Sequence, residues 1–238
     1  MTNAFKWAAA AGVILGVGSV ALGQGAPPGI PWSNAAGTGT FFNWDNGQNS
    51  TTNLFGSPIL MNGTQFVFFP SGYVAQGENG TSQTTTDRFD VDLTAFAGYK
   101  FTEIRIETFG DYSITGQGSV NVIGSLDINE LIGPQRITSD ALLPVPPGSM
   151  PVVNTTGGVS GNFQMLASRD LTLIEGGIPF TELHISFTNN VIAISGPGGV
   201  AQIGKTVVGF PIAVTIIPEP GMIALLGLGG LVAMRRRR

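Results

Sequence analysis

The sequence contains no cysteine, a single histidine (His184) and few charged residues, which make up 11% of its 238 positions. Without cysteine no disulfide can form, so a folded domain has to rely on its hydrophobic core. One histidine cannot supply a two-histidine metal site, and the cysteine nucleophile of thiol enzymes is missing. The 11 basic residues are outnumbered by 15 acidic ones, which argues against nucleic acid as a partner.

The common catalytic patterns are missing as well. The sequence has no Gly-x-Ser-x-Gly nucleophile turn and no His-Glu-x-x-His zinc motif. Two carboxylates from distant strands could still form a hydrolase site of the glycosidase type, because separation in space is not visible in a sequence. We therefore predict a protein that is not an enzyme and needs no cofactor, with a hydrolase as the open alternative.

The first 24 residues have the layout of a secretory signal peptide. Lys6 supplies a positive charge, and an apolar run follows it from residue 8 to residue 22. Small residues come next, so signal peptidase would cut in the region of Ala21, Gly23 and Gln24. A retained membrane anchor is the alternative, but the run is short and rich in glycine. The pattern predicts export of the rest of the chain.

The last 21 residues combine three features in a fixed order. Pro218, Glu219 and Pro220 come first, an uncharged stretch over 222–234 follows, and the chain closes with Arg235, Arg236, Arg237 and Arg238. As a helix the uncharged stretch would be about 20 Å long, shorter than the ~30 Å hydrocarbon core of a bilayer. Four arginines are costly to translocate, so they are expected to stay in the cytoplasm and stop transfer of this short membrane helix.

This order of features resembles the PEP-CTERM sorting signal of exported bacterial proteins, a tail also labelled an ice-binding protein C-terminal domain. The resemblance covers residues 218–238. It implies that an exosortase, a membrane-embedded protease-like enzyme, recognises Pro218, Glu219 and Pro220 and processes the chain nearby. Prolines on both sides of Glu219 disfavour a helix, which suits the extended backbone that a protease binds. A permanent anchor, in which Pro-Glu-Pro is only a linker, is the alternative.

Residues 25–217 form the body, and its sequence favours β-strands throughout. Apolar and polar residues alternate over 101–109, 119–128 and 181–188, which is typical of half-buried strands. Further strands are expected at 65–69, 88–93, 170–174, 191–194 and 209–217. Tight turns are expected at 45–47 and 189–190, a mobile polar loop at 81–86 and a long loop at 141–161. We predict a single all-β domain, either a β-sandwich or a jelly roll.

Two groups of side chains in the body could bind a ligand. Asp90 and Asp92 share a strand face with Asp87 on the approach, so these carboxylates could converge on Ca²⁺, although a solvated strand face explains them more simply. Trp32 and Trp44 could stack on sugar rings if they are exposed, although aromatic side chains in a β-sandwich are more often part of the core.

Together these features predict an exported, exosortase-sorted protein that serves as a structural or adhesive component of the cell envelope or the extracellular matrix. Its expected partners are signal peptidase, an exosortase-like enzyme and the membrane, through the C-terminal segment. The alternative is a carbohydrate-binding module for extracellular polysaccharide on the same architecture. The expected location is the envelope, the outer surface or the extracellular space.

Overall fold

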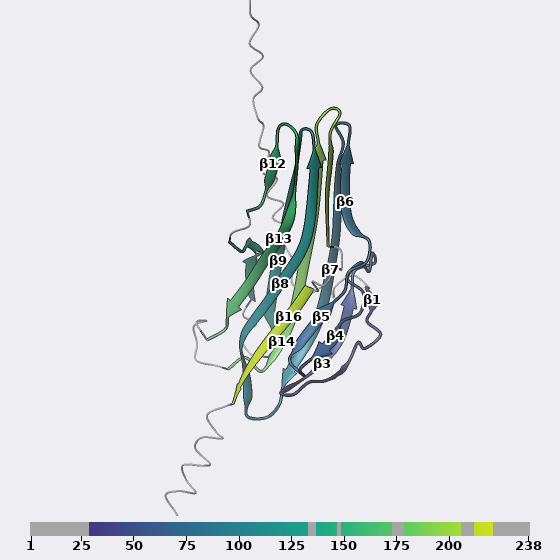
Figure 1. Ribbon diagram of the computed structural model, residues 1–238. Coiled ribbons are helices and arrows are strands. Elements are labelled where there is room, and N and C mark those ends of the chain that lie inside the picture. The colour runs from purple at the N-terminus through teal and green to yellow at the C-terminus, as the bar shows by residue number, and fades with distance from the viewer. Residues whose placement is uncertain (1–28, 133–136, 147–148, 173–178, 206–211, 221–238) are drawn as a thin grey trace, which may run out of the picture.

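A computed structural model of the protein describes residues 29–132, 137–146, 149–172, 179–205 and 212–220. These residues form strands and no helix, and the strands build two sheets that lie face to face (Figure 1). The prediction of an all-β sandwich is confirmed. Within the described ranges no helix is long and apolar enough to cross a membrane. The predicted signal peptide and the predicted membrane helix lie outside these ranges.

The first sheet, here called sheet A, is antiparallel and has long strands at its centre. Its spatial order is β1 (Ile30–Pro31), β3 (Phe42–Asn49), β7 (Ser82–Ala95), β14 (Glu182–Ser195), β9 (Gly118–Glu130) and β10 (Ile137–Ala141), with β2 (Gly37–Thr38) beside β3 and β12 (Val152–Asn154) beside β9. Each residue of β14 from 183 to 194 has a register partner on both β7 and β9. Sheet A is therefore held together through β14.

The second sheet, sheet B, is antiparallel as well and is organised around β8. Its spatial order is β11 (Leu143–Pro144), β13 (Gly158–Asp170), β8 (Tyr99–Thr115), β16 (Ile212–Pro220), β5 (Gln65–Phe68) and β4 (Ile59–Met61), with β15 (Val200–Lys205) beside β8 and β6 (Tyr73–Glu78) beside β15. One half of β8 pairs with β15 and the other half with β16. Both strands are needed to cover this edge of β8.

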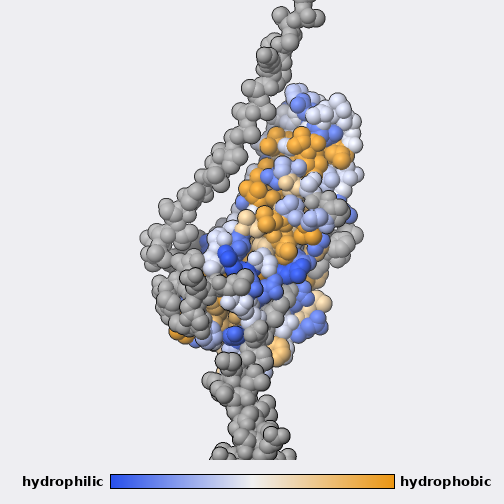
Figure 2. Space-filling model, turned by 90° about the vertical axis from the view of Figure 1, so that its left-hand side faces the viewer, coloured by the Kyte–Doolittle hydropathy of each residue, from blue (hydrophilic) through white to orange (hydrophobic). Residues whose placement is uncertain are grey.

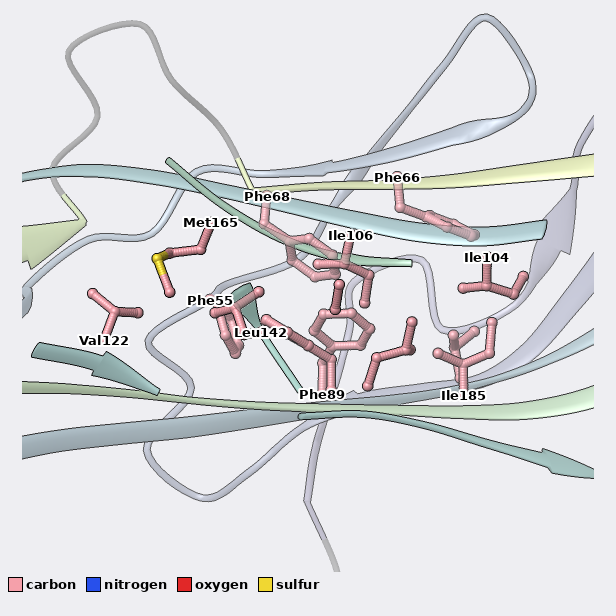
Figure 3. Close-up of a cluster of buried hydrophobic side chains, with 14 of the residues drawn as sticks. Phe55, Phe66, Phe68, Phe89, Ile104, Ile106, Val122, Leu142, Met165 and Ile185 are labelled. Atoms are coloured by element: carbon pink, nitrogen blue, oxygen red, sulfur yellow. The ribbon is translucent and has the colours of Figure 1, made fainter. Parts of the chain in front are cut away.

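The core lies between the two sheets and is rich in aromatic rings. Alternation along β8 turns Ile104 and Ile106 toward sheet A, where both are fully buried. The rings of Phe68 and Phe89 stack with their centroids 4.7 Å apart, and Phe55 packs edge-on against Phe89 (Figure 3). Burial of each such ring contributes about 2–3 kcal/mol to stability. The core replaces the disulfides that the sequence cannot form.

Both predicted tight turns are wrong, because tertiary pairing overrides the turn preference of asparagine. β14 continues through residues 189 and 190, which pair with β7 on one side and β9 on the other. β3 continues through residues 45–47 with a register shift between Asp45 and Gln48 that marks a β-bulge. Asn46 has a φ of 56° in this bulge, a left-handed conformation that asparagine tolerates better than most residues.

Three further local predictions are also wrong. The polar tract at 81–86 belongs almost entirely to β7, and the expected loop at 141–161 contains β11, β12 and the start of β13. Of the strand expected at 170–174, Asp170 ends β13, residues 171 and 172 are not in a strand, and residues 173 and 174 lie outside the described ranges. Polar strands of this kind lack the apolar alternation that identifies a half-buried strand, and only their pairing partners fix them.

Candidate functional sites

The sorting motif forms the end of a strand of the sandwich. In the register between β16 and β8, Glu219 lies opposite Lys100 and Pro220 lies opposite Tyr99. A β-bulge between Ile217 and Pro218 separates the motif from the rest of the strand. The last strand thus runs three residues beyond residue 217, where the sequence predicted the end of the body.

Among the described strands, the motif has a neighbour on one side only. Pairing between β16 and β5 ends at Thr215 and Gln65, whereas pairing with β8 continues to Pro220. Proline cannot donate a ladder hydrogen bond and is accommodated in sheets at edges and bulges. The position of the two prolines, after a bulge and beside a single neighbour, meets this requirement. The backbone of the motif is extended, as the sequence predicted.

A second polar site lies on the outer face of sheet A, where His184 of β14 meets two aspartates of β7. Nδ1 of His184 lies 2.6 Å from Oδ1 of Asp92, and Nε2 lies 3.5 Å from Oδ1 of Asp90. Arg88 donates to the same oxygen of Asp90 from Nε at 2.9 Å and Nη2 at 2.6 Å. Asn46 donates from Nδ2 to Oδ2 of Asp92 at 2.8 Å. We call these five residues the His184 cluster.

The charges of the His184 cluster support one another. Hydrogen bonds to Asp90 and Asp92 outweigh the effect of burial and raise the pKa of His184 to about 9. Burial alone would raise the pKa of Asp90, but hydrogen bonds from His184 and Arg88 bring it below its usual value. The pKa of Asp92 is lowered in the same way, because bonds from His184 and Asn46 outweigh burial. The ring is therefore an imidazolium at neutral pH.

This geometry suits an ionic link between strands better than proton-transfer chemistry. Both ring nitrogens of His184 face carboxylates, so neither is left with a lone pair for a substrate near neutral pH. Asn46 of the cluster and its neighbour Asp45 are both exposed, and their side chains can form hydrogen bonds with a bound molecule. The sequence identified His184 as a polar-face residue but not its two partners.

Asp87 does not join the other two aspartates. It is 1% exposed, and its carboxylate accepts hydrogen bonds from Thr52 Oγ1 at 2.9 Å, from the Phe55 amide at 2.8 Å and from Ser50 Oγ. It fastens the loop over 50–55 to the edge of β7. Within the described ranges no group of three or more His, Cys, Asp or Glu side chains is placed to hold a metal ion. The calcium interpretation therefore finds no support.

The two candidate stacking residues belong to the core, which is the simpler of the two interpretations that the sequence allowed, and they form no sugar platform. Trp32 is 3% exposed and Trp44 is 7% exposed, and the rings of both pack against Phe66. Their indole N–H groups are used internally. Trp32 Nε1 donates to Asn49 Oδ1 and Trp44 Nε1 to the Asn34 carbonyl, both at 2.9 Å. Neither ring face is open to a ligand.

A buried polar group in the core was not predicted from the sequence. Lys205 is 2% exposed, lies 5.8 Å above the ring centroids of Tyr73 and Phe163, and donates to Thr108 Oγ1. Burial lowers the pKa of this amine well below its usual value. The Tyr73 hydroxyl accepts from the Asp87 amide at 3.0 Å. The sequence did contain a pattern that could have identified this burial. Along β15, alternation places Lys205 on the same inward face as the apolar residues Ala201 and Ile203.

Comparison with known proteins identifies the C-terminal segment. The fold is an all-β sandwich whose last strand carries a tripeptide signal, and a family model described as the PEP-CTERM protein-sorting motif matches residues 217–238. The resemblance predicted from the sequence is thereby confirmed for these residues. The motif indicates an exported protein that an exosortase sorts to the cell surface. No curated protein matches the sequence.

Solved structures show only weak likeness to the body. The structure of TmCBM61 in complex with β-1,4-galactotriose is 10% identical, with a TM-score of 0.21, and the match covers 81% of this chain and 100% of that one. A putative sugar binding protein from Bacteroides thetaiotaomicron is 7% identical with a TM-score of 0.20, over 66% of this chain and 90% of that one. The tailspike protein 4 of bacteriophage CBA120 is 12% identical with a TM-score of 0.20. The match covers 61% of this chain and 20% of that one. Such low scores support no statement about function.

Proposed function

We propose that the sandwich is a non-catalytic structural or adhesive component of the cell envelope or extracellular matrix, placed there by exosortase processing. The observation that carries this proposal is the sorting motif at the end of β16, directly continuous with the folded body. A domain that is delivered by such a signal works outside the cytoplasm, where a stable, disulfide-free β-sandwich is a suitable building unit.

The surface is consistent with contacts to other macromolecules. Leu143 of β11 and Val153 of β12 are 62% and 67% exposed. Figure 2, which views the molecule from the side on which β12 and β13 lie in Figure 1, shows hydrophobic residues gathered toward the upper end of this face. Contiguous apolar surface on a soluble domain commonly marks an interaction site. Val153 lies at this end of the sandwich, because β12 pairs with the start of β9.

The test is the mass and location of the mature protein in the host cell. Intact mass spectrometry of membrane and extracellular fractions would compare the wild type, Glu219→Ala and Glu78→Ala. Glu78 is an exposed carboxylate at the end of β6, at the opposite end of the sandwich from the motif (Figure 1). We expect the wild type and Glu78→Ala to lose the arginine tail, and Glu219→Ala to stay uncut in the membrane. Retention of the tail by the wild type would mean a permanent anchor.

A second candidate is binding of extracellular polysaccharide on the outer face of sheet A. The observation that favours it is the row of polar side chains that crosses three neighbouring strands, from Asp45 on β3 through Asp92 on β7 to His184 on β14. Carboxylates and amides of this kind bind sugar hydroxyls by hydrogen bonds. The site differs from the tryptophans that the sequence suggested, because it consists of polar groups on the outer face, of which Asp45 is exposed and Asp92 and His184 are half-buried.

Retardation of the protein in gels that contain the host polysaccharide would test this candidate. Asn46→Ala with Asp45→Ala removes one exposed member of the His184 cluster and the exposed carboxylate beside it, and leaves His184, Asp90 and Arg88 in place. We expect saturable retardation of the wild type and its loss in the double variant. Equal mobility of both proteins at every polysaccharide concentration would exclude this face as the binding site.

A further inference from the structure

Among the described strands, the second half of β16 has a partner on one edge only, and we call its other edge the open edge. Residues 213–220 pair with β8 over their whole length, whereas only residues 212–215 pair with β5. The strand therefore has neighbours on both sides at its start and on one side at its end. The open edge begins after Thr215 and includes the sorting motif.

The same strand connects two parts of sheet B. Among the described strands, β5 has β16 and β4 as its paired neighbours, so β16 is what joins this pair of strands to β8. A cut before Thr215 would remove ladder hydrogen bonds on both edges and loosen β4 and β5 from the sheet, whereas a cut between residues 216 and 220 would remove pairs with β8 only. A cut beyond Pro220 would leave every one of these pairs in place.

We propose that the sorting enzyme reads the motif on the folded sandwich, along the open edge of β16, and cuts the chain on the C-terminal side of Pro220. The proposal rests on the proposed function, since it requires that an exosortase processes the chain. Proteins commonly bind an extended segment by adding a strand to an open edge. A cut inside β16 would remove pairs of the sheet, whereas a cut beyond the strand would leave them intact.

The spacing of the prolines fits recognition on an edge. Successive residues of a strand direct their backbone N–H and C=O groups to opposite edges. Pro218 and Pro220 therefore face one edge, and Glu219 faces the other. With Glu219 turned to β8, the missing N–H groups of the prolines fall on the open edge, where β8 loses no hydrogen bond. The motif can stay docked, and at Pro218 and Pro220 its open edge offers the enzyme two backbone carbonyls as acceptors and no N–H donor, so the enzyme has to supply the donors.

The covalent step is the hydrolysis of one peptide bond. One water is consumed: its hydroxyl group ends on the new carboxyl terminus, and its proton ends on the amine of the released tail. The mature protein then keeps residues 218–220 as the end of β16. The fold and the recognition signal are both preserved after processing.

The first experiment reads the new C-terminus directly. Mature wild-type protein would be isolated from the host, digested, and its C-terminal peptide sequenced by tandem mass spectrometry. We expect a terminus at Pro220 or at a later residue. A terminus at Glu219 or any earlier residue would overturn the proposal. A chain that keeps its arginine tail would count against the proposed function instead, so the two failures are distinguishable.

The second experiment asks whether the strand has to leave the sheet. Glu103 and Ile217 are register partners next to the motif, and the chain has no cysteine of its own. Directly opposite residues of an antiparallel pair have a spacing that a disulfide can bridge. The variant Glu103→Cys with Ile217→Cys would therefore fasten β16 to β8 when oxidised, and alkylation before mass spectrometry would show which molecules are linked.

We expect linked molecules to be cut at the same bond, and to the same extent, as each single-cysteine variant. Accumulation of uncut chain only in the linked state would overturn the proposal, because it would show that the enzyme has to peel β16 from β8 first. The two single variants control for effects of the substitutions on folding and export.

Discussion

The proton on His184 links the stability of the sandwich to pH. Asp90 and Asp92 raise the pKa of His184 from its usual 6.5 to about 9, so the folded protein holds a proton that the unfolded chain releases earlier as the pH rises. The stabilisation is complete below the usual pKa and is lost as the pH rises through about 9. Asp90 and Asp92 have lowered pKa values. Their contribution to the free energy of unfolding is therefore lost at acidic pH, as the pH falls through the range in which these carboxylates titrate.

We expect His184→Gln to lower the free energy of unfolding by on the order of 3 kcal/mol near pH 6, and to have little effect near pH 10. The reason is that the wild type has lost the contribution of the proton at the higher pH. Urea titrations at the two pH values would measure the difference. Thr94→Ala, an exposed change on β7, is the control and should be independent of pH. An equal loss for His184→Gln at both pH values would contradict the ionic link.

The buried amine of Lys205 is expected to cost stability. Because burial lowers its pKa, the unfolded chain binds a proton that the folded protein binds less readily, and stability rises with pH up to the usual lysine pKa. Lys205→Met together with Thr108→Val removes both polar partners and keeps the volume. We expect this pair to raise the free energy of unfolding by about 1–4 kcal/mol at neutral pH and to abolish the rise with pH, as measured by urea titration.

Lys205→Ala serves as the comparison for that prediction. It removes the amine but leaves a cavity and an unpaired Thr108 hydroxyl, so we expect a loss of stability instead of a gain. The double variant Lys205→Met with Thr108→Val could also prove no more stable than the wild type. That result would contradict the prediction, because it would mean that the contacts of the amine with Thr108 and the aromatic rings offset the whole free-energy cost of its burial.

Residue roles were predictable where the chemistry is local. Pro218, Glu219 and Pro220 were identified because the tripeptide and its flanking segments are adjacent in the sequence. The place of Trp32 was left open, Asp87 was grouped with aspartates that it does not join, and Lys205 was missed, because the roles of these residues depend on which strand faces them. A tryptophan gives the same sequence signal in a core as on a binding surface.

The bulge in β3 makes a prediction at the level of a strand. A Cβ atom added to Gly47 would lie 2.3 Å from Cε3 of Trp32, whose amide donates to the Gly47 carbonyl at 3.0 Å. We expect Gly47→Ala to displace the indole and to lower the free energy of unfolding by about 1–3 kcal/mol. Near-ultraviolet circular dichroism and urea titration would report the change.

Gly158→Ala in β13 is the matched control for Gly47→Ala. A Cβ atom there meets its nearest neighbour, the Ile114 carbonyl oxygen, at 3.7 Å, which is ordinary contact distance. Both glycines lie in strands, so the two substitutions change the backbone entropy of the unfolded chain similarly. Equal stability changes for both variants would mean that the Trp32 contact does not constrain Gly47.

Strands with clear alternation were predictable, and strands defined by their neighbours were not. The apolar residues of β8, β9 and β14 repeat with period two, and the sequence located all three. The sequence split β14 at Asn189, a residue with high turn preference that is fully buried and paired on both sides. Pairing with distant strands decided the structure there, and such pairing is not encoded in a local pattern.

For the whole molecule, the sequence located the delivery signal and the fold class but not their connection. Composition and alternation indicated a disulfide-free β-sandwich, and the order of features in the tail indicated sorting. The motif was expected to follow the body as a separate segment. In the structure it continues a strand that joins β8 to β5, which makes the signal part of the fold.

This connection predicts how far the chain can be shortened. A chain that ends at Pro220 keeps all pairs of β16, and we expect it to unfold in urea at the same midpoint as the full chain. A chain that ends at Phe210 lacks β16, so β4 and β5 lose their attachment and the Phe66 and Phe68 rings lose their fixed position in the core. We expect this shorter chain to lose cooperative unfolding and to bind a dye for exposed apolar surface. A cooperative transition with an unchanged midpoint would show that β16 is dispensable. The requirement that processing spare the strand would then have no structural basis.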